Sequence, residues 1–401
     1  MTKWLSIIGM GEDGYDGLSA RARLLVDQAE VIVGAERLLS LTPQTGATRE
    51  VWPQPFSAVV TQIRRLRGRK TALLATGDPC NYGVARKVLE FIPATEVEIV
   101  PHISAFSLAA ARLCWSLPDC DTLTLHGRPA AQIEAFIQPG ARLIALTENA
   151  ATIAEVARRL VARRFGQSRI TVLENMGGAR EKQSSFRAAD YRDASYSDLN
   201  TIGIECIPDA GAALLPRVPG LPDNAYVHDG QLTKREVRAA TLAALGPTPD
   251  ALLWDVGAGC GSIAIEWMRA ARGARAIAIE RDESRLAMLA ENADRLGTPR
   301  INIVNGEAPA ALAGLEEPDA VFIGGGVGDP GVFETSWEAL KSGGRMVANV
   351  VTLEGELHVI DLQDKHGGDL VRIDVSVLSK VGDLRALKPR MSVLQWRAIK
   401  P

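Results

Sequence analysis

A proline-rich break near the middle of the chain most constrains how this sequence can fold. The stretch from Pro208 to Pro222 contains four prolines and two glycines, a composition that cannot sustain a helix or a central strand. It divides the 401 residues into halves of about 207 and 179, each within normal domain size. We therefore expect two domains, residues 1–207 and 223–401, joined by a linker at 208–222.

Both halves alternate apolar, strand-like runs with amphipathic helical stretches, which predicts an α/β fold with largely parallel sheets. In the first half, the expected strands lie near Trp4–Ile8, Glu30–Val33, Thr71–Ala75, Glu96–Val100, Thr122–Leu125, Arg142–Leu146, Arg169–Leu173 and Thr201–Glu205. In the second half, they lie near Leu252–Val256, Arg275–Ile279, Asn302–Val304, Ala320–Ile323, Arg345–Asn349, Leu370–Val377 and Ser392–Trp396. The last two have no obvious helix between them.

Composition excludes several classes of protein. No apolar run approaches the ~18–20 residues that a membrane helix needs, and the N-terminus is a strand running into glycines rather than a signal peptide, so we expect a cytoplasmic protein. The first half has 24 basic and 22 acidic residues and the second has 21 and 26. Neither has the basic excess of a nucleic-acid binder. The five cysteines form no Cys-x-x-Cys, so we expect reduced, mostly buried thiols and no metal site.

A glycine loop follows the first expected strand of the second half. Asp255-Val256 leads into Gly257-Ala258-Gly259-Cys260-Gly261, and Ser262 opens a helix. Glycines there let the backbone turn tightly and approach a ligand without an intervening Cβ. A dinucleotide-binding loop is the alternative, but it needs its third glycine one position later.

Three further features favour a methyl donor, S-adenosylmethionine. Glu280 ends the next strand, where its carboxylate can accept hydrogen bonds from both ribose hydroxyls. The third strand runs into Gly306-Glu307-Ala308, a position that lines an adenine pocket, and the fourth ends in Gly324-Gly325-Gly326. Ahead of the loop, Thr233 and Glu236 have capping-box spacing, which would also let Thr233 cover the donor's carboxylate end.

These motifs together resemble the CbiT-type domain of cobalamin biosynthesis over residues 223–401. The resemblance implies a Rossmann-like class I methyltransferase fold. It also implies donor contacts in this half at Thr233, Gly257, Ala258, Gly259, Cys260, Gly261, Glu280, Gly306, Glu307 and Ala308.

A different set of motifs runs through the first half. Gly9-Met10-Gly11 follows the first expected strand, Thr76-Gly77-Asp78-Pro79 follows a central one, and Pro101-His102-Ile103-Ser104-Ala105 opens a helix. In order, they resemble the two-lobed class III tetrapyrrole methylase domain, in its CbiE branch. The implied donor contacts in this half are Gly77, Asp78, Asn81, Ser104, Ala105 and Thr147. Many members have glycine where this chain has His102, and a positive φ there would strain the histidine.

The order of the two domains is similar to that in the CobL-type family of corrin methyltransferases. That resemblance implies two S-adenosylmethionine sites, one per domain, and a tetrapyrrole substrate. It implies methylation of precorrin-6Y (precorrin-6B) at C5 by the first domain. The second domain would methylate C15 and decarboxylate the C12 acetate, giving precorrin-8. Both families usually self-associate, so we expect a homo-oligomer without nucleic-acid or membrane partners.

The sequence identifies the residues that act on the substrate less clearly than those that bind the donor. Lys234, Arg235 and Arg238 beside the second site and Arg128 beside the first are candidates for binding substrate carboxylates, although each could equally be an exposed helix cation. His228 and Tyr226 are candidate proton donors. Two other functions compete with this one: a fusion of class III and class I RNA methyltransferases, and a non-catalytic sensor of S-adenosylmethionine.

Overall fold

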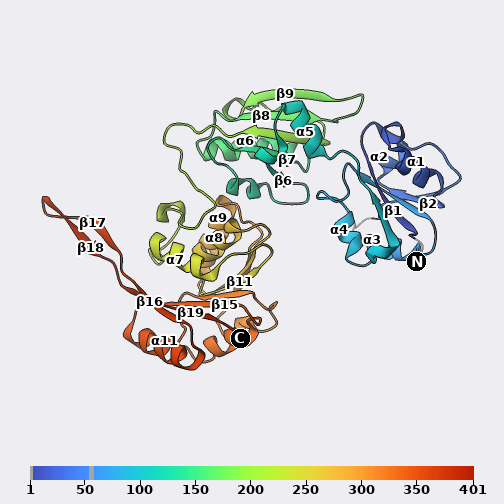
Figure 1. Cartoon of the computed structure of the whole chain (residues 1–401). Helices are drawn as coiled ribbons and strands as arrows, with labels where there is room; N and C mark the ends of the chain where they lie inside the picture. The colour runs from blue at the N-terminus through green and yellow to red at the C-terminus, as the bar shows by residue number, and fades with distance from the viewer. Residues whose placement is uncertain (1–2, 54–57) are drawn as a thin grey trace. The chain divides into compact units, whose positions relative to one another are not determined.

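The computed structural model describes residues 3–53 and 58–401 and divides into two compact units (Figure 1). The first unit contains the chain up to Ala130 together with Pro139–Ala212. The second contains Ala213–Pro401 and also the short segment Ala131–Gln138 from the first half of the sequence.

The first sheet of the first unit is wholly parallel, in the order β3-β2-β4-β1-β5. Its strands are β1 (Leu5–Met10), β2 (Val31–Gly34), β3 (Thr48–Val51), β4 (Thr71–Thr76) and β5 (Val97–Val100), with helices α1 (Ala20–Asp27), α2 (Glu36–Ser40), α3 (Val59–Arg65) and α4 (Ala85–Leu89). The inner strands β1, β2 and β4 are almost continuously buried, as parallel strands covered on both faces must be, and all three were expected. The edge strand β3 is half-exposed and polar, so it lacks the apolar run that predicts a strand.

The second sheet of this unit is mostly antiparallel, in the order β6-β7-β10-β8-β9. Its strands are β6 (Asp121–Thr124), β7 (Arg142–Leu146), β8 (Arg169–Glu174), β9 (Lys182–Arg187) and β10 (Asn200–Glu205), and the helices of this part are α5 (Ala105–Leu113) and α6 (Ala151–Ala162). β10 pairs antiparallel with both β7 and β8. The expectation of largely parallel sheets is therefore wrong for this sheet, because the exposed strand β9 returns directly alongside β8 and β10 inserts between β7 and β8.

The second unit is built on one seven-stranded sheet in the order β13-β12-β11-β14-β15-β19-β16. Its strands are β11 (Leu252–Val256), β12 (Arg275–Glu280), β13 (Asn302–Asn305), β14 (Ala320–Ile323), β15 (Arg345–Val350), β16 (Asp369–Ile373) and β19 (Val393–Ile399), with helices α7 (Arg235–Leu245), α8 (Ser262–Ala270), α9 (Glu283–Arg295), α10 (Val332–Ala339) and α11 (Leu353–His366). Strands β11 to β15 are parallel and β19 is antiparallel to its neighbours. All seven strands were expected, and the Rossmann-like architecture is confirmed.

A two-stranded hairpin, β17 (Ser376–Val381) and β18 (Leu384–Pro389), projects from this unit (Figure 1). We call residues Ser376–Pro389 the arm. The sequence predicted one strand over Leu370–Val377, but β16 ends at Ile373 and the chain then enters the arm. Every residue of β18 is exposed, so no pattern of buried apolar residues could indicate this strand from the sequence.

The proline-rich stretch contains no helix or strand, as expected, but its second half is fastened to the second unit. Arg269 donates to the carbonyl of Leu215 at 2.7 Å. The carboxylate of Glu266 accepts hydrogen bonds from the backbone amides of Gly220 and Leu221 at 2.6 and 3.1 Å. Leu221 is fully buried, so this part of the stretch is packed rather than free.

The cysteines are less buried than the sequence predicted. None of the five cysteines, all of which the structure describes, forms a disulfide, but only Cys206 and Cys260 are buried, whereas Cys80 and Cys114 are exposed. The prediction of mostly buried thiols is therefore wrong. Among the residues that the structure describes, no helix is both long and apolar enough to cross a bilayer.

Candidate functional site

A cavity of about 840 Å³ opens at the carboxyl ends of the parallel strands of the second unit. The residues that follow β11, β12, β13 and β14 all line it, as expected for ligand sites in α/β sheets. The sequence-predicted donor residues found in its wall are Thr233, Gly257, Ala258, Gly259, Cys260, Glu280, Gly306, Glu307 and Ala308. The structure therefore brings together segments that lie up to 75 residues apart, from Thr233 to Ala308.

The three glycines of the loop have two different roles, packing and openness to the cavity. Gly257, Gly259 and Gly261 have φ values of 74°, 57° and 81°, which L-residues rarely adopt. A Cβ on Gly261 would lie 2.7 Å from Leu289, so this glycine allows α8 and α9 to pack. Around Gly257 and Gly259 no atom lies within 3.7 Å of a built Cβ, and these two leave the backbone open toward the cavity.

Glu280 at the end of β12 is held by the backbone. Its Oε2 accepts from the amide of Gly259 at 2.8 Å, and its Oε1 accepts from the amides of Arg281 and Asp282, both at 2.9 Å. The carboxylate is nearly buried, with a relative exposure of 6%. A carboxylate oriented in this way keeps lone pairs for further donors, which suits the hydroxyl pair of a ribose.

Asp255, the last residue but one of β11, also faces the cavity, although the sequence analysis gave it no role. Its Oδ2 accepts from the amide of Ala264 at 3.0 Å, while its Oδ1 is buried and has no partner among the described residues. Burial raises the pKa of Asp255 from an ordinary 3.8 to about 7, and the nearby charge of Glu280 adds to this rise. A buried carboxylate with an unsatisfied oxygen is suited to a cationic ligand group.

The start of α7 differs from the expected capping box. The cap residue of the helix is Lys234, and its side chain makes no capping hydrogen bond. The amide of Arg235 is instead capped by Asp223, whose Oδ1 accepts at 3.0 Å. The capping-box prediction is therefore wrong, because a carboxylate from the end of the proline-rich stretch takes that place. Thr233 and Lys234 line the cavity, and Arg235 does not.

Tyr226 and Arg238 lie in a buried polar cluster outside the cavity wall. Arg238 is fully buried and donates to Glu266 at 2.6 Å and to Asp223 at 3.2 Å. The hydroxyl of Tyr226 donates to Glu266 at 2.8 Å, and burial raises the pKa of Tyr226 well above 10. His228 accepts from the amide of Gly230 at 2.9 Å within its own turn. The contacts of Tyr226 and Arg238 fasten α7 and the segment before it onto α8, whereas the contact of His228 stays within its own turn.

The far wall of the cavity comes from a part of the chain that the sequence analysis left without a role. The residues there are Asn349 in β15, Val351 directly after it, Val375, Arg390 and Met391 at the base of the arm, and Val393 in β19. The wall is mostly apolar. No local motif indicates these residues, because they meet only through the pairing of β15, β19 and β16.

In the first unit, five of the six predicted donor residues lie in the segments after β4 and β5, whereas Thr147 follows β7. Gly77 has a φ of 62°, and a Cβ on it would lie 3.4–3.7 Å from the backbone of Ile103, Ser104 and Ala105. Asp78 holds its turn by accepting from the amide of Cys80 at 2.8 Å. Asn81 follows in the same turn, with its amide donating to the carbonyl of Asp78 at 3.1 Å.

Ser104 and Thr147 both have local partners. Ser104 caps α5 by accepting from the amide of Ser107 at 3.1 Å. Thr147 is buried and its hydroxyl lies 2.7 Å from Asn200 Oδ1. A role for Thr147 toward a ligand would therefore fall to its backbone.

His102 lies in the loop after β5 without the positive φ that would strain it. A Cβ on Gly9 would lie 2.1 Å from the carbonyl oxygen of Gly77 and 2.5 Å from the amide nitrogen of His102. Three of the predicted loops therefore meet with their backbones in close contact, and it is Gly9 that permits this.

Arg128, the carboxylate-binding candidate of the first unit, lies over the ring of Tyr82, with its guanidinium carbon 5.5 Å from the ring centroid. Tyr82 follows Asn81 directly in sequence, and its hydroxyl donates to the carbonyl of Thr122 at 3.1 Å. Tyr82 thus links Arg128 to the turn that carries Asp78 and Asn81.

Family comparisons cover both units. Residues 5–190 match the tetrapyrrole (corrin/porphyrin) methylases, and residues 224–400 match the precorrin methyltransferase domain. A Sinorhizobium protein named precorrin-6Y C(5,15)-methyltransferase [decarboxylating] is 44% identical over 398 residues, covering 99% of this chain and 96% of the relative. A Mycobacterium tuberculosis protein of the same name is 35% identical over 399 residues, covering 98% and 99% of the two chains.

A solved structure, the C-terminal domain of a Rhodobacter capsulatus precorrin-6Y C5,15-methyltransferase, is 46% identical. It covers 46% of this chain and 100% of its own, with a TM-score of 0.44.

Proposed function

The chain belongs to the precorrin-6Y C(5,15)-methyltransferase (decarboxylating) family, and from this premise we propose how its two units divide the reaction. The first unit methylates C5 of the reduced corrin precursor precorrin-6Y. The second unit methylates C15 and removes carbon dioxide from the C12 acetate, giving precorrin-8. The single observation that carries the proposal is that both units match corrin methyltransferase families separately while one relative aligns along 99% of the chain.

The methyl transfer depends more on the alignment of donor and substrate than on a reactive group of the protein. S-adenosylmethionine supplies a methyl group on a sulfonium, and an electron-rich, enamine-like ring carbon attacks it. No covalent enzyme intermediate is required. The contribution of the protein is to hold both molecules in line and to exclude water.

The residues of the second unit fit this donor. Gly257 and Gly259 leave open backbone beside the cavity, Glu280 presents an oriented carboxylate to a ribose, and Asp255 offers a buried, unsatisfied oxygen to a cationic group. Four acidic residues line the cavity, Asp255, Glu280, Glu307 and Asp329, together with four basic ones, Lys234, Arg281, Arg285 and Arg390, and acidic groups beside the glycine loop suit a cationic sulfonium donor.

We propose a second donor site in the first unit, at the loops after β4 and β5. There the contacts would be mainly to backbone, because Gly77 packs against the backbone of residues 103–105 and the side chains of Asp78 and Ser104 are engaged locally. Arg128 on Tyr82 would bind a carboxylate of the macrocycle beside it.

Decarboxylation in the second unit needs an electron sink and a proton. The electron pair of the broken carbon–carbon bond passes into the conjugated, ring-protonated macrocycle, and the acetate carbon then takes a proton to become a methyl group. Tyr226 and Arg238 are held in a buried cluster, so we assign them to structure and propose that water, or the macrocycle itself, delivers this proton.

Mass spectrometry of the product formed from precorrin-6Y and S-adenosylmethionine tests the function. We expect a gain of two methyl groups with the loss of one carbon dioxide. Calorimetry with the donor should give two sites per chain. An unchanged precursor would contradict the function, whereas methylation of RNA would support the competing one.

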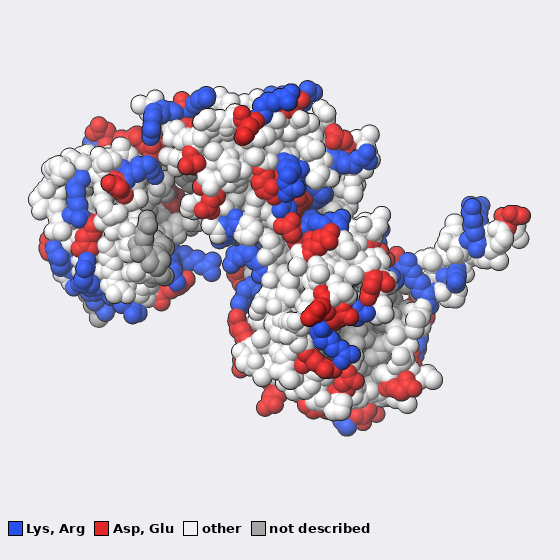
Figure 2. All heavy atoms as spheres, turned by 180° about the vertical axis from the view of Figure 1, so that it is seen from behind, with Lys and Arg blue, Asp and Glu red and all other residues white. Residues whose placement is uncertain are grey.

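We also propose that the chain self-associates through the arm. Leu378 and Leu387 are cross-strand partners, as are Val381 and Leu384, and all four are 61–76% exposed. Figure 2 shows the projecting arm mostly white, with a few charged residues. An isolated two-stranded hairpin is marginally stable in water, and apolar side chains on both of its faces favour packing against a second copy.

Replacing Leu384 and Leu387 by serine should lower the mass of the particle measured by light scattering. The matched control is Val218→Ser, which alters a 67% exposed apolar residue outside the arm. An unchanged mass in the arm variant would argue against this interface. The cytoplasmic location expected from the sequence stays a prediction, as does the absence of nucleic-acid partners.

A further inference from the structure

The cavity of the second unit has cationic residues on two sides, and they differ in what holds them. On the donor side, Arg281 pairs with Glu307, and Arg285 donates to Asp229 and Gln231 at 2.9 and 2.8 Å. These two flank the loops assigned to the donor. Lys234 also lines the cavity and donates to the carbonyl of Gly230 at 3.0 Å. On the opposite wall the cation is Arg390, the residue that directly follows the arm.

Arg390 is fixed at its backbone but only loosely at its guanidinium. Its amide donates to the carbonyl of Val375 at 2.8 Å, which closes the base of the arm. Its Nη1 donates to Glu236 at 3.1 Å, and the two side chains are 32% and 49% exposed. An exposed ion pair of this kind contributes between nothing and about 1 kcal/mol, so a stronger carboxylate partner can replace Glu236 at little cost.

The surroundings of Arg390 suit the face of a large conjugated ring with charged edges. Val375, Met391 and Val393 stand beside it in the cavity wall, and Met391 is 69% exposed. An apolar wall with one arginine at its rim can bind a flat macrocycle by its face and one carboxylate by the planar guanidinium fork.

Resting on the proposed function, we propose that Arg390 is the carboxylate-recognition residue for the tetrapyrrole at the second active site, with Glu236 as its placeholder in the free enzyme. The carboxylate it binds is a non-reacting one at the ring periphery. An ion pair with arginine would stabilise a carboxylate against losing carbon dioxide, whereas the reacting acetate needs the apolar wall, where its charge is destabilised. Arg390 is therefore a specificity residue and takes no part in bond breaking.

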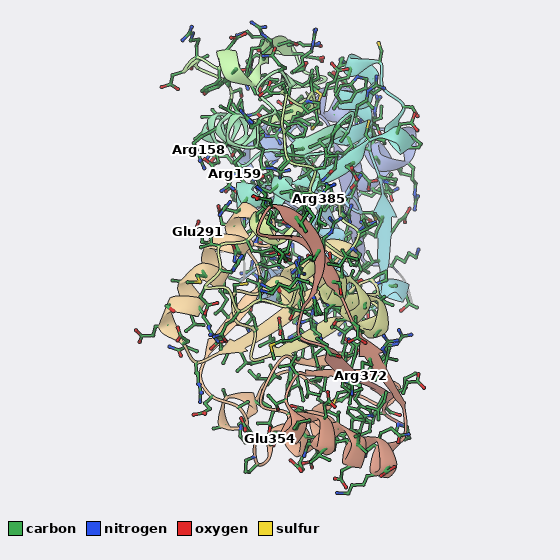
Figure 3. All side chains as sticks on the ribbon, turned by 90° about the vertical axis from the view of Figure 1, so that its left-hand side faces the viewer. Arg158, Arg159, Glu291, Glu354, Arg372 and Arg385 are labelled. Carbon is green, nitrogen blue, oxygen red and sulfur yellow. The ribbon has the colours of Figure 1, made fainter. Side chains whose placement is uncertain are left out.

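The test is steady-state kinetics of the full chain with precorrin-6Y and S-adenosylmethionine, following C5 methylation, C15 methylation and carbon dioxide release. The variants are Arg390→Met, Arg390→Lys and Glu236→Gln. The matched control is Arg372→Met, which removes an exposed arginine of β16, labelled in Figure 3, that pairs with Glu356 and does not line the cavity.

We expect Arg390→Met to raise KM for the two reactions of the second unit roughly 10- to 100-fold, the range for a lost charge-assisted hydrogen bond, with kcat within about twofold. Arg390→Lys should recover part of the loss, since it keeps the charge without the fork. Glu236→Gln should lower KM, because the placeholder is gone. In Arg390→Met, donor affinity measured by calorimetry and the rate of C5 methylation should not change. The Arg372→Met control should keep the wild-type KM.

Two outcomes would overturn the proposal. One is an unchanged KM in Arg390→Met. The other is faster carbon dioxide release in that variant, which would mean that Arg390 restrains the reacting carboxylate. Should Arg390→Met fail to fold, Glu236→Gln decides, and an unchanged or raised KM in it contradicts the placeholder role. A wild-type enzyme that yields no methylated product would instead contradict the proposed function itself.

Discussion

At the residue scale, the positive φ of individual glycines connects sequence to function most directly. Gly259 has a φ of 57°, and a Cβ on it would point into the cavity, 3.8 Å from the carbonyl oxygen of Gln231. Only glycine adopts this conformation without strain. The spacing of Gly257, Gly259 and Gly261 was therefore enough to predict this part of the candidate site from sequence.

Gly259→Ala should leave only C5 methylation, because the added Cβ crowds the donor in the second unit and the left-handed backbone adds about 1–2 kcal/mol of strain. Product mass should show one added methyl group and retained carboxyl. Gly343→Ala is the control, with a φ of 76° and open space around the Cβ; it introduces the same strain without touching the cavity. Two added methyl groups in Gly259→Ala would contradict the division of labour.

Asp255 links protonation to the stability of the second unit. Its folded-state pKa of about 7 lies above the ordinary 3.8, so the folded state holds a proton that the unfolded state releases as the pH rises from about 4 to 7. The free energy of unfolding therefore falls over that window, and above pH 7 the total loss is on the order of 4 kcal/mol.

Asp255→Asn should raise the free energy of unfolding, measured in urea at pH 8, and the gain should vanish near pH 4. The same variant should bind the cationic donor more weakly in calorimetry. A difference between variant and wild type that does not depend on pH would show that Asp255 is not buried as a proton-holding carboxyl group.

At the scale of elements, one buried cluster fastens the proline-rich stretch, α7 and α8 together. Glu266 on α8 accepts from Arg238 on α7 and from Tyr226, Gly220 and Leu221 ahead of it. The sequence suggested Arg238 and Tyr226 as groups facing the substrate. Only the fold shows that their partner is a glutamate in the next helix.

Arg238→Met should lower the free energy of unfolding by about 3–5 kcal/mol, because it leaves the charge of Glu266 buried without its cation. Adding Glu266→Leu should recover part of this loss. Urea unfolding of both variants measures the effect. Full stability of Arg238→Met combined with lost turnover would instead favour a role at the substrate.

At the scale of the whole molecule, the path of the chain is less simple than two domains in succession. Residues Ala131–Gln138 belong to the second unit, although they precede the last strands of the first. Gln138 donates to the carbonyl of Leu215 at 2.6 Å, and the guanidinium carbon of Arg217 lies 4.9 Å from the ring centroid of Phe136. Glu134 in this segment is only 3% exposed.

Gly297→Ala should release this segment. Gly297 has a φ of 85°, and a Cβ on it would lie 2.5 Å from the backbone nitrogen of Ala135, a distance that forces the segment to move. We expect faster cleavage at Glu134 by a glutamate-specific protease. Gly314→Ala, with a φ of 75° and open surroundings, controls for backbone strain, and equal cleavage in both variants would contradict the packing.

The sequence by itself determined the family, the buried parallel strands and the loops at their ends. Each of these depends on residues close together in the chain: an apolar run, a turn that only glycine permits, a helix that follows. A polar edge strand such as β9 and the exposed arm carry no such pattern, and they form only because another strand pairs with them.

The tertiary structure alone decided what surrounds the loops that line the cavity. Glu236 and Arg390 are 154 residues apart, and no local preference places them in contact. The same holds for the burial that raises the pKa of Asp255 and for the partner of Arg238. Local sequence determines backbone conformation, whereas the environment of a charged side chain depends on which distant segments the fold packs against it.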